Sequence, residues 1–220
     1  AKVHDWFAPT QKSAGVCRHP APLASLGVGL LVEAQANAAP LPEGVALLFA
    51  RLAGQMASQG NVLIPQTSAL LRHPAFLGAA LAEAPRPTLA FSQRIHRADG
   101  ADTAGLHIMA MPTTRWVETL TAIGASGALH MLLAWRDAGR PTPIGHPMIP
   151  MLSIALAGDG ADESSAPLAD IVLPAEEGPV EWNERVLRRM SELASGRYEP
   201  LALAHGNVDF QIARCGGVSL

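Results

Sequence analysis

The chain has 220 residues, of which 49% are hydrophobic and 16% are charged, and its formal net charge is −3 at pH 7. This composition excludes a mainly disordered chain, and the length allows one large domain or two small lobes. The 16 Lys and Arg residues are scattered and form no basic stripe interleaved with aromatic residues, so we expect no nucleic-acid partner.

Cysteine usage and the polar start of the chain bear on the compartment. Cys17 and Cys215 lie near opposite ends of the chain and form no CxxC pair. Two free thiols are the simpler interpretation, and a disulfide between them is the alternative. The opening AKVHDWFAPTQKS carries charge and a proline where a signal peptide has an apolar run, and no apolar stretch is long enough for a bilayer. We therefore expect a cytoplasmic protein without a membrane partner.

The first half of the chain alternates short apolar runs with amphipathic segments. Residues 1–22 are polar and rich in proline, which indicates a loop or an extended arm. Residues 23–37 fit a helix or a strand followed by a helix. The segments after these predict a helix at 45–58, a strand at 61–65, two helical pieces over 67–84 divided at Pro74, and a strand at 88–91.

The second half continues the alternation. It predicts strands at 105–112, 127–135, 151–158, 169–174 and 210–214 and helices at 115–125 and 178–196. Thr114 is expected to cap the first of these helices, and Gly196 to end the second.

Strands alternating with helices on short connections predict a layered α/β fold. The sheet is expected to be mostly parallel and flanked by helices, Rossmann-like in layout but without a dinucleotide fingerprint. We assign residues 60–220 to this α/β domain. Residues 1–59 form an N-terminal arm and helical segment, either separate or part of the same unit.

Polar residues follow four predicted strands. They are Gln66 with Thr67, Ser92 to Arg94, Thr113 to Arg115, and Arg136 with Asp137. Ligands of open parallel sheets bind at the carboxyl ends of the strands, and guanidinium groups pair with carboxylates through two hydrogen bonds. This pattern predicts a site for a small acidic ligand. The alternative is that these residues simply occupy solvated loops.

Three histidines need separate interpretations. His107 and His130 lie in apolar runs, where a hydrogen-bonded core residue is more common than a metal ligand. His146 lies in the glycine- and proline-rich loop 139–150 and could bind a metal or transfer a proton, but no HxH or HxxxH spacing supports a metal site.

The remaining motifs give weaker signals. Glu118 follows Arg115 by three residues, which favours an ion pair on one helix face over a general base. GxSxG, P-loop and GxGxxG patterns are absent, so we expect no nucleotide cofactor.

Four segments together resemble the C-terminal region of the altronate and galactarate dehydratases, the sugar-acid hydro-lyases. AGRPTPIGHPMIPMLSI is similar to the family's TGRGTPFG loop and the strand after it, and GLHIMAMPTTRWVETLTAIGASG resembles its GLVFMDTPG…TGLVAGGA segment. ADIVLPAEEGP stands where the family has IDFNAG, and LASGRYEPLALAHGNVDFQIARCGGVSL is similar to its ASGE…EIAIFKDGVTL end. The segments keep the family's order across roughly residues 60–220.

The resemblance implies removal of water from an aldonic or aldaric acid. Such a reaction needs a base for the proton next to the carboxylate and an acid, here a divalent Fe2+, Mn2+ or Mg2+ ion, to help the hydroxyl leave. Arg140 and Thr142 would bind the substrate carboxylate, and His146 would be catalytic at the hydroxyl. Arg115 and Gln66, at the strand ends, complete the predicted substrate contacts.

Departures from the family pattern support a second hypothesis. Gln66 stands where the family has an acidic residue, Ala110 replaces an aspartate, and Pro141 replaces a glycine. The family's cysteine motif and small N-terminal module have no clear counterpart. The alternative is therefore a catalytically silent domain for ligand binding or assembly, with a separate N-terminal module or a second copy of the chain as partner.

Overall fold

The computed structural model describes residues 23–32, 40–83, 104–111, 114–125, 129–136, 144–157 and 169–210. None of the helices in these ranges is long and apolar enough to cross a membrane.

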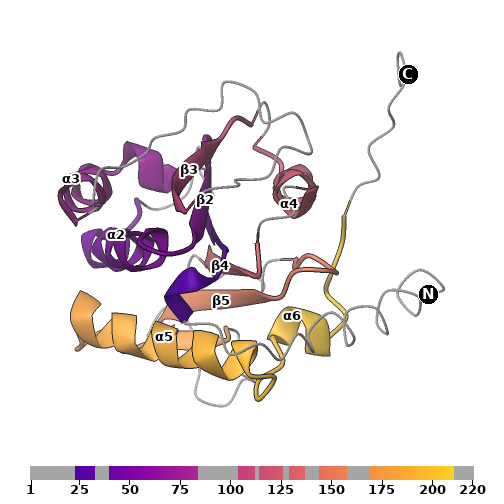
Figure 1. The fold of residues 1–220 in the computed structure, drawn as a ribbon. Helices are drawn as coiled ribbons and strands as arrows, with labels where there is room; N and C mark the ends of the chain where they lie inside the picture. Colours follow the sequence, from indigo (N-terminus) through magenta and orange to yellow (C-terminus); the bar gives the residue numbers. More distant parts are fainter. Residues whose placement is uncertain are drawn as a thin grey trace.

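Six strands form one sheet in which every neighbouring pair is parallel (Figure 1). Their order is β3-β2-β1-β4-β5-β6. The strands are β1 (Val28–Leu31), β2 (Asn61–Pro65), β3 (Gly105–Met109), β4 (Met131–Trp135), β5 (Met151–Leu156) and β6 (Ile171–Leu173). The predicted layered α/β fold with a parallel sheet is confirmed.

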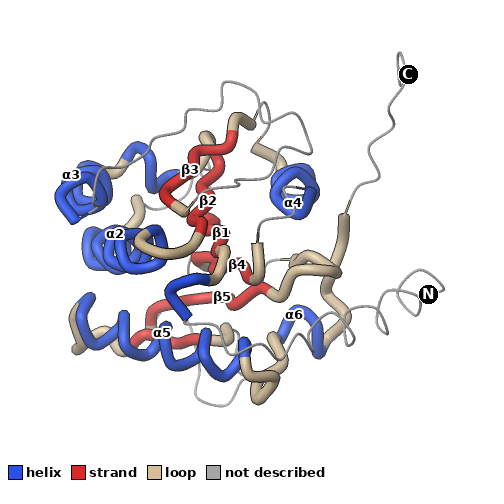
Figure 2. The backbone as a smooth tube through the Cα atoms, viewed as in Figure 1, coloured by secondary structure: helices blue, strands red, loops and turns tan. Residues whose placement is uncertain are grey.

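Helices cover both faces of the sheet, as Figure 2 shows. α2 (Glu43–Ala57), α3 (Pro74–Glu83) and α5 (Pro179–Ala194) lie on one face, and α4 (Trp116–Ala125) and the short α6 (Leu201–Ala204) lie on the other. Two 3-10 turns, η1 (Leu23–Ser25) and η2 (Ala69–Arg72), precede β1 and α3.

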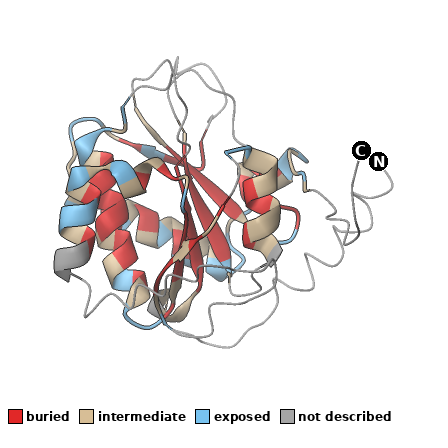
Figure 3. Ribbon diagram, turned by 90° about the horizontal axis from the view of Figure 1, so that it is seen from above, coloured by how far each residue is buried: buried red, intermediate tan, exposed pale blue. Residues whose placement is uncertain are grey.

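Alternating strand side chains divide the core between the two faces. Leu30 and Leu133 pack with α2 and α5, whereas their neighbours Leu31 and Leu132 pack with α4. Both clusters are closed to solvent, and the strands form the buried centre between the helical layers (Figure 3). Burial on both faces explains why these strands read as continuous apolar runs.

The return from β4 to β5 has no helix in its described part. Residues 144–150 form an irregular loop that bends at 147–149, and the Trp116 indole donates a 2.6 Å hydrogen bond to the Ile144 carbonyl. Ile149 and Ala202 join the core cluster beneath α4. The loop and α6 therefore cover the part of the sheet face that α4 does not cover.

Most predicted elements agree with the structure. Pro74 begins α3, and Gly196, with φ 71°, follows the last turn of α5. Residues 28–31 form a strand at the centre of the sheet, so residues 23–32 and 40–57 pack with the later strands. α4 begins one residue later than a Thr114 cap implies. The predicted strand at 88–91, and all but the first residue of that at 210–214, lie outside the described residues.

Candidate functional site

The strand order reverses direction between β1 and β4. The chain adds β2 and β3 on one side of β1, then crosses to add β4, β5 and β6 on the other. In open parallel sheets the carboxyl ends at such a reversal leave a crevice in which ligands bind. The topology therefore selects the end of the sheet formed by Leu31, Pro65 and Trp135.

A pocket opens at this end of the sheet, next to the start of α4. The pocket is partly open: its non-atom space is about 300 Å³, a figure that includes open solvent. Its lining comes from the ends of β1 and β2 and from the first turn of α4: Leu31, Val32, Pro65, Thr67, Ser68, Thr114, Trp116 and Thr119.

Two of the four hydroxyl side chains in the lining are held by the backbone. The Ser68 hydroxyl, 2% exposed, donates to the Val32 carbonyl at 3.2 Å and accepts from the Leu70 N–H at 3.4 Å. Thr119 donates to the carbonyl of Arg115 at 3.0 Å. The Ser68–Val32 bond ties the end of β2 to the end of β1, whereas the Thr119 bond stays within the start of α4.

The other two hydroxyls can meet a ligand. Thr67 is half-buried and Thr114 is exposed, and within the described part of the chain neither side chain makes a hydrogen bond. Thr114 lies two residues before α4, where the first N–H groups of the helix favour an anion. The pocket thus offers hydroxyls and a helix start against an apolar floor.

Two of the predicted substrate-binding residues lie at this end of the sheet. Gln66 is the first residue after β2; its side chain is exposed, and its N–H donates to the Met109 carbonyl at 2.8 Å. Arg115 directly precedes α4, its side chain is 81% exposed, and it forms the predicted ion pair with Glu118 at 3.3 Å. Arg140 and Thr142 lie outside the described residues.

His146 lies elsewhere. Its ring packs against Gly124, in the last turn of α4, whereas the pocket adjoins the first turn. Eight residues of helix separate Trp116 from Gly124, which is about 12 Å along the axis. The structure therefore brings Gln66 and Arg115 to one end of α4 and His146 to the other.

The contacts of His146 describe a neutral imidazole. Nδ1 accepts hydrogen bonds from the N–H groups of Met148 at 3.1 Å and Ile149 at 3.2 Å, so the proton resides on Nε2. Burial lowers the pKa of His146 to about 4. Its side chain thus holds the turn before β5, and its role as a proton donor stays a prediction.

The other two histidines differ: His107 lies in the core, as expected, whereas His130 is exposed just before β4, so the expected core position is wrong for it. His130 Nδ1 accepts a 2.9 Å hydrogen bond from the Gly27 N–H, which ties the entry of β4 to that of β1. His107 is buried within β3. Among the described residues no group of three or more His, Cys, Asp or Glu side chains could hold a metal ion, so they do not fit the divalent ion that the resemblance implies.

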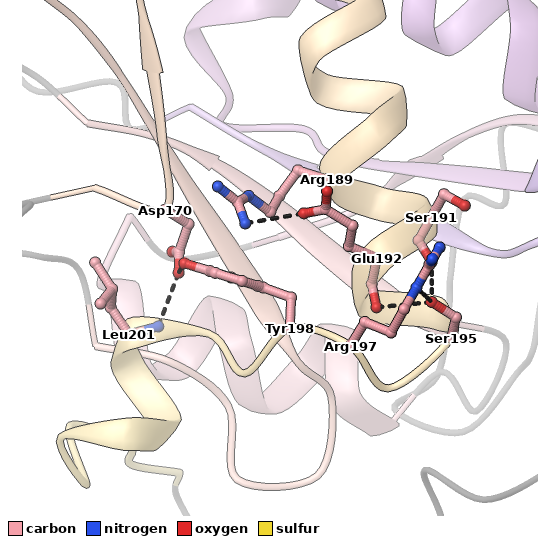
Figure 4. Close-up of polar contacts among 8 residues, drawn as sticks. All are labelled: Asp170, Arg189, Ser191, Glu192, Ser195, Arg197, Tyr198 and Leu201. Atoms are coloured by element: carbon pink, nitrogen blue, oxygen red, sulfur yellow. Dashed lines mark hydrogen bonds and ion pairs between the residues drawn. The ribbon is translucent and has the colours of Figure 1, made fainter.

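A buried carboxylate that sequence reasoning missed organises the β5–β6 edge of the sheet (Figure 4). Asp170, 5% exposed, lies just before β6. One oxygen accepts from the Ser153 N–H at 2.7 Å and the Ser153 hydroxyl at 2.6 Å. The other accepts from the Tyr198 hydroxyl and the Leu201 N–H, both at 2.8 Å.

Tyr198 completes this cluster. Burial, and next the hydrogen bond to Asp170, raise the pKa of its phenol above the ordinary value. The Arg189 guanidinium lies 4.0 Å from the centre of its ring, and Arg189 also pairs with Glu192 at 2.9 Å. The arrangement fixes α6 to the sheet. An aspartate directly before an apolar strand, in ADIVLP, was the only sequence signal for it.

Comparison with known proteins adds no assignment to this geometry: no protein-family model and no curated protein matches the chain.

Proposed function

We propose that the chain binds a small hydroxy acid of the aldonate or aldarate class at the carboxyl ends of β1 and β2. The observation that carries the proposal is the pocket at the reversal of strand order, where Thr67 and Thr114 present hydroxyls beside the start of α4. Hydroxyl side chains can both donate to and accept from sugar hydroxyls, and the helix start favours the carboxylate.

A dehydratase activity is the second candidate, and the position of one resembling segment favours it. Residues 105–127, which resemble the hydro-lyase family, supply β3 and α4 and so contribute Thr114, Trp116 and Thr119 to the pocket. Dehydration would remove the proton on the carbon next to the carboxylate and the neighbouring hydroxyl, and the enol product would rearrange to a keto-deoxy acid. The described residues supply no metal site for that step, so ligand binding is the primary proposal.

Calorimetric titration with a panel of aldonates and aldarates tests the binding proposal. The matching aldoses and alditols serve as neutral competitors. We expect saturable binding of at least one acid, and the variants Thr67→Val and Thr114→Val to weaken it about threefold to tenfold, the effect of one lost hydrogen bond. Thr121→Val is the matched control, because its hydroxyl bonds to the Val117 carbonyl within α4 and does not line the pocket. Failure of every acid to bind would refute the proposal.

The same acids separate binding from catalysis. Incubation with Fe2+, Mn2+ or Mg2+, followed by a chemical assay for keto-deoxy acids, would show product if the chain is a dehydratase. Saturable binding without product would favour the silent binding domain, and a Thr114→Val variant that loses product but keeps its melting temperature would place turnover at this pocket.

A further inference from the structure

We propose that Arg136 is the cation that receives the carboxylate of the ligand. This inference rests on the proposed function, because it assigns one group of the same acid to one side chain. Among the described residues the pocket lining contains hydroxyl and apolar side chains but no cationic one, so we look for a positive group on a neighbouring described element.

The position of Arg136 follows from the β4 backbone. It is the first residue after β4, and its N–H donates to the Ile154 carbonyl at 2.8 Å, which continues the ladder between β4 and β5. Because that pairing keeps the chain extended, the alternation of side chains continues through it. Leu132 and Ala134 face the α4 side, and Arg136 is the next residue of that series.

The register between β1 and β4 places this side chain beside the pocket. Leu31, which lines the pocket on the α4 side, pairs with Ala134. Neighbouring strands lie about 4.8 Å apart, and two residues along a strand cover about 6.6 Å. An arginine side chain spans such a distance, so the Arg136 guanidinium can reach the open side of the pocket from the point where strand order reverses.

Burial distinguishes Arg136 from Arg115. Arg136 is half-buried, and desolvation lowers the pKa of its guanidinium, whereas the Arg115 side chain is 81% exposed. A partly desolvated cation interacts more strongly with an incoming carboxylate than a solvated one, and exposed ion pairs contribute little. The guanidinium also matches the two oxygens of a carboxylate, which an ammonium group does not.

The test titrates four variants with the acid that binds the wild-type protein. We expect Arg136→Gln to weaken acid binding about 10-fold to 100-fold and Arg136→Lys to weaken it less, because lysine keeps the charge but loses the paired geometry. Arg188→Gln, on the exposed side of α5, is the matched control and should bind as the wild type does. Arg115→Gln tests whether Arg115, rather than Arg136, binds the carboxylate of the ligand.

The outcomes separate this inference from the proposal beneath it. If no acid binds the wild type, the proposed function fails. If an acid binds and Arg136→Gln binds it equally well, or if Arg115→Gln carries the larger loss, the assignment of Arg136 is overturned while the pocket stands. A neutral aldose should bind Arg136→Gln as it binds the wild type; a parallel loss for the aldose would mean a general distortion of the pocket and would also overturn the assignment. Melting temperatures without ligand report whether each variant is folded.

Discussion

Replacing Asp170 by asparagine should destabilise the fold far more than the small chemical change suggests. Each carboxylate oxygen accepts two hydrogen bonds, from Ser153 on one side and from Tyr198 and Leu201 on the other. An amide must place its NH2 group against one of these pairs, where the backbone N–H loses its acceptor and the hydroxyl must turn to accept instead, so both bonds to the charged carboxylate are lost on that side. Hydrogen bonds to charged groups contribute about 1.5 kcal/mol or more each, so we expect a loss of about 3 kcal/mol. That is a large share of a stability of about 5 to 15 kcal/mol.

Denaturant unfolding followed by tryptophan fluorescence measures this loss. The matched control is Asp209→Asn, an identical change at an exposed position where the side chain accepts a hydrogen bond from the Phe210 N–H and, among the described residues, from no other group. We expect the control to change the free energy of unfolding by less than about 0.5 kcal/mol. If Asp170→Asn is no more destabilising than the control, then the carboxylate does not hold β5, β6 and α6 together, and our explanation of that cluster is wrong.

Three further predictions concern groups that the structure places under constraint. Gly124→Ala should destabilise the protein by about 1 to 3 kcal/mol, although alanine is the better helix former, because a Cβ would stand 2.8 Å from His146 Cε1 and closer to Nε2. In a His146→Ala background this loss of stability should vanish, and denaturant unfolding of the single and double mutants measures it. Burial lowers the pKa of His146 to about 4, so the free energy of unfolding should fall as pH drops from about 6.5 towards 4. His146→Asn keeps an acceptor but does not titrate, so it should flatten this decline; an unchanged slope would mean that His146 is not the group responsible. Tyr198 is the single tyrosine, so ultraviolet titration of the folded chain reports its pKa directly. We expect ionisation well above the ordinary pKa of about 10, with stability lost as pH rises above that value, and an easier ionisation in Asp170→Asn.

Local patterns predicted the elements well because their causes are local. Apolar runs gave the strands β2 to β6 a clear signature, although only β2 to β5 are largely buried on both faces and the edge strand β6 exposes Val172. Gly196 marks the end of α5 because its backbone adopts φ 71°. The segment around Val28 was ambiguous, since a strand of four residues is too short for its periodicity to exclude a helix.

The site depends on partners that are distant in sequence. Leu31 meets the pocket because β1 pairs with β2 and β4, and nothing near residue 31 encodes that pairing. Asp170 binds Ser153, 17 residues earlier, and Leu201, 31 residues later. His146 looked functional because it lies next to a proline in a loop. In the structure its Nδ1 accepts hydrogen bonds from the nearby Met148 and Ile149 N–H groups, and Gly124 of α4, distant in sequence, lies against its ring.

The central position of β1 also affects how the chain folds. Its hydrogen-bonded neighbour β4 begins 103 residues later, so Val28 and Met131 can pair only after a very long loop has closed. Pairings at such separation slow folding, because the entropy of loop closure is lost before the contacts are gained. During synthesis the backbone groups along one edge of the apolar strand β1 remain unpaired until β4 has been made. Folding should therefore be slow, and truncated chains that end before residue 131 should aggregate through this unpaired edge.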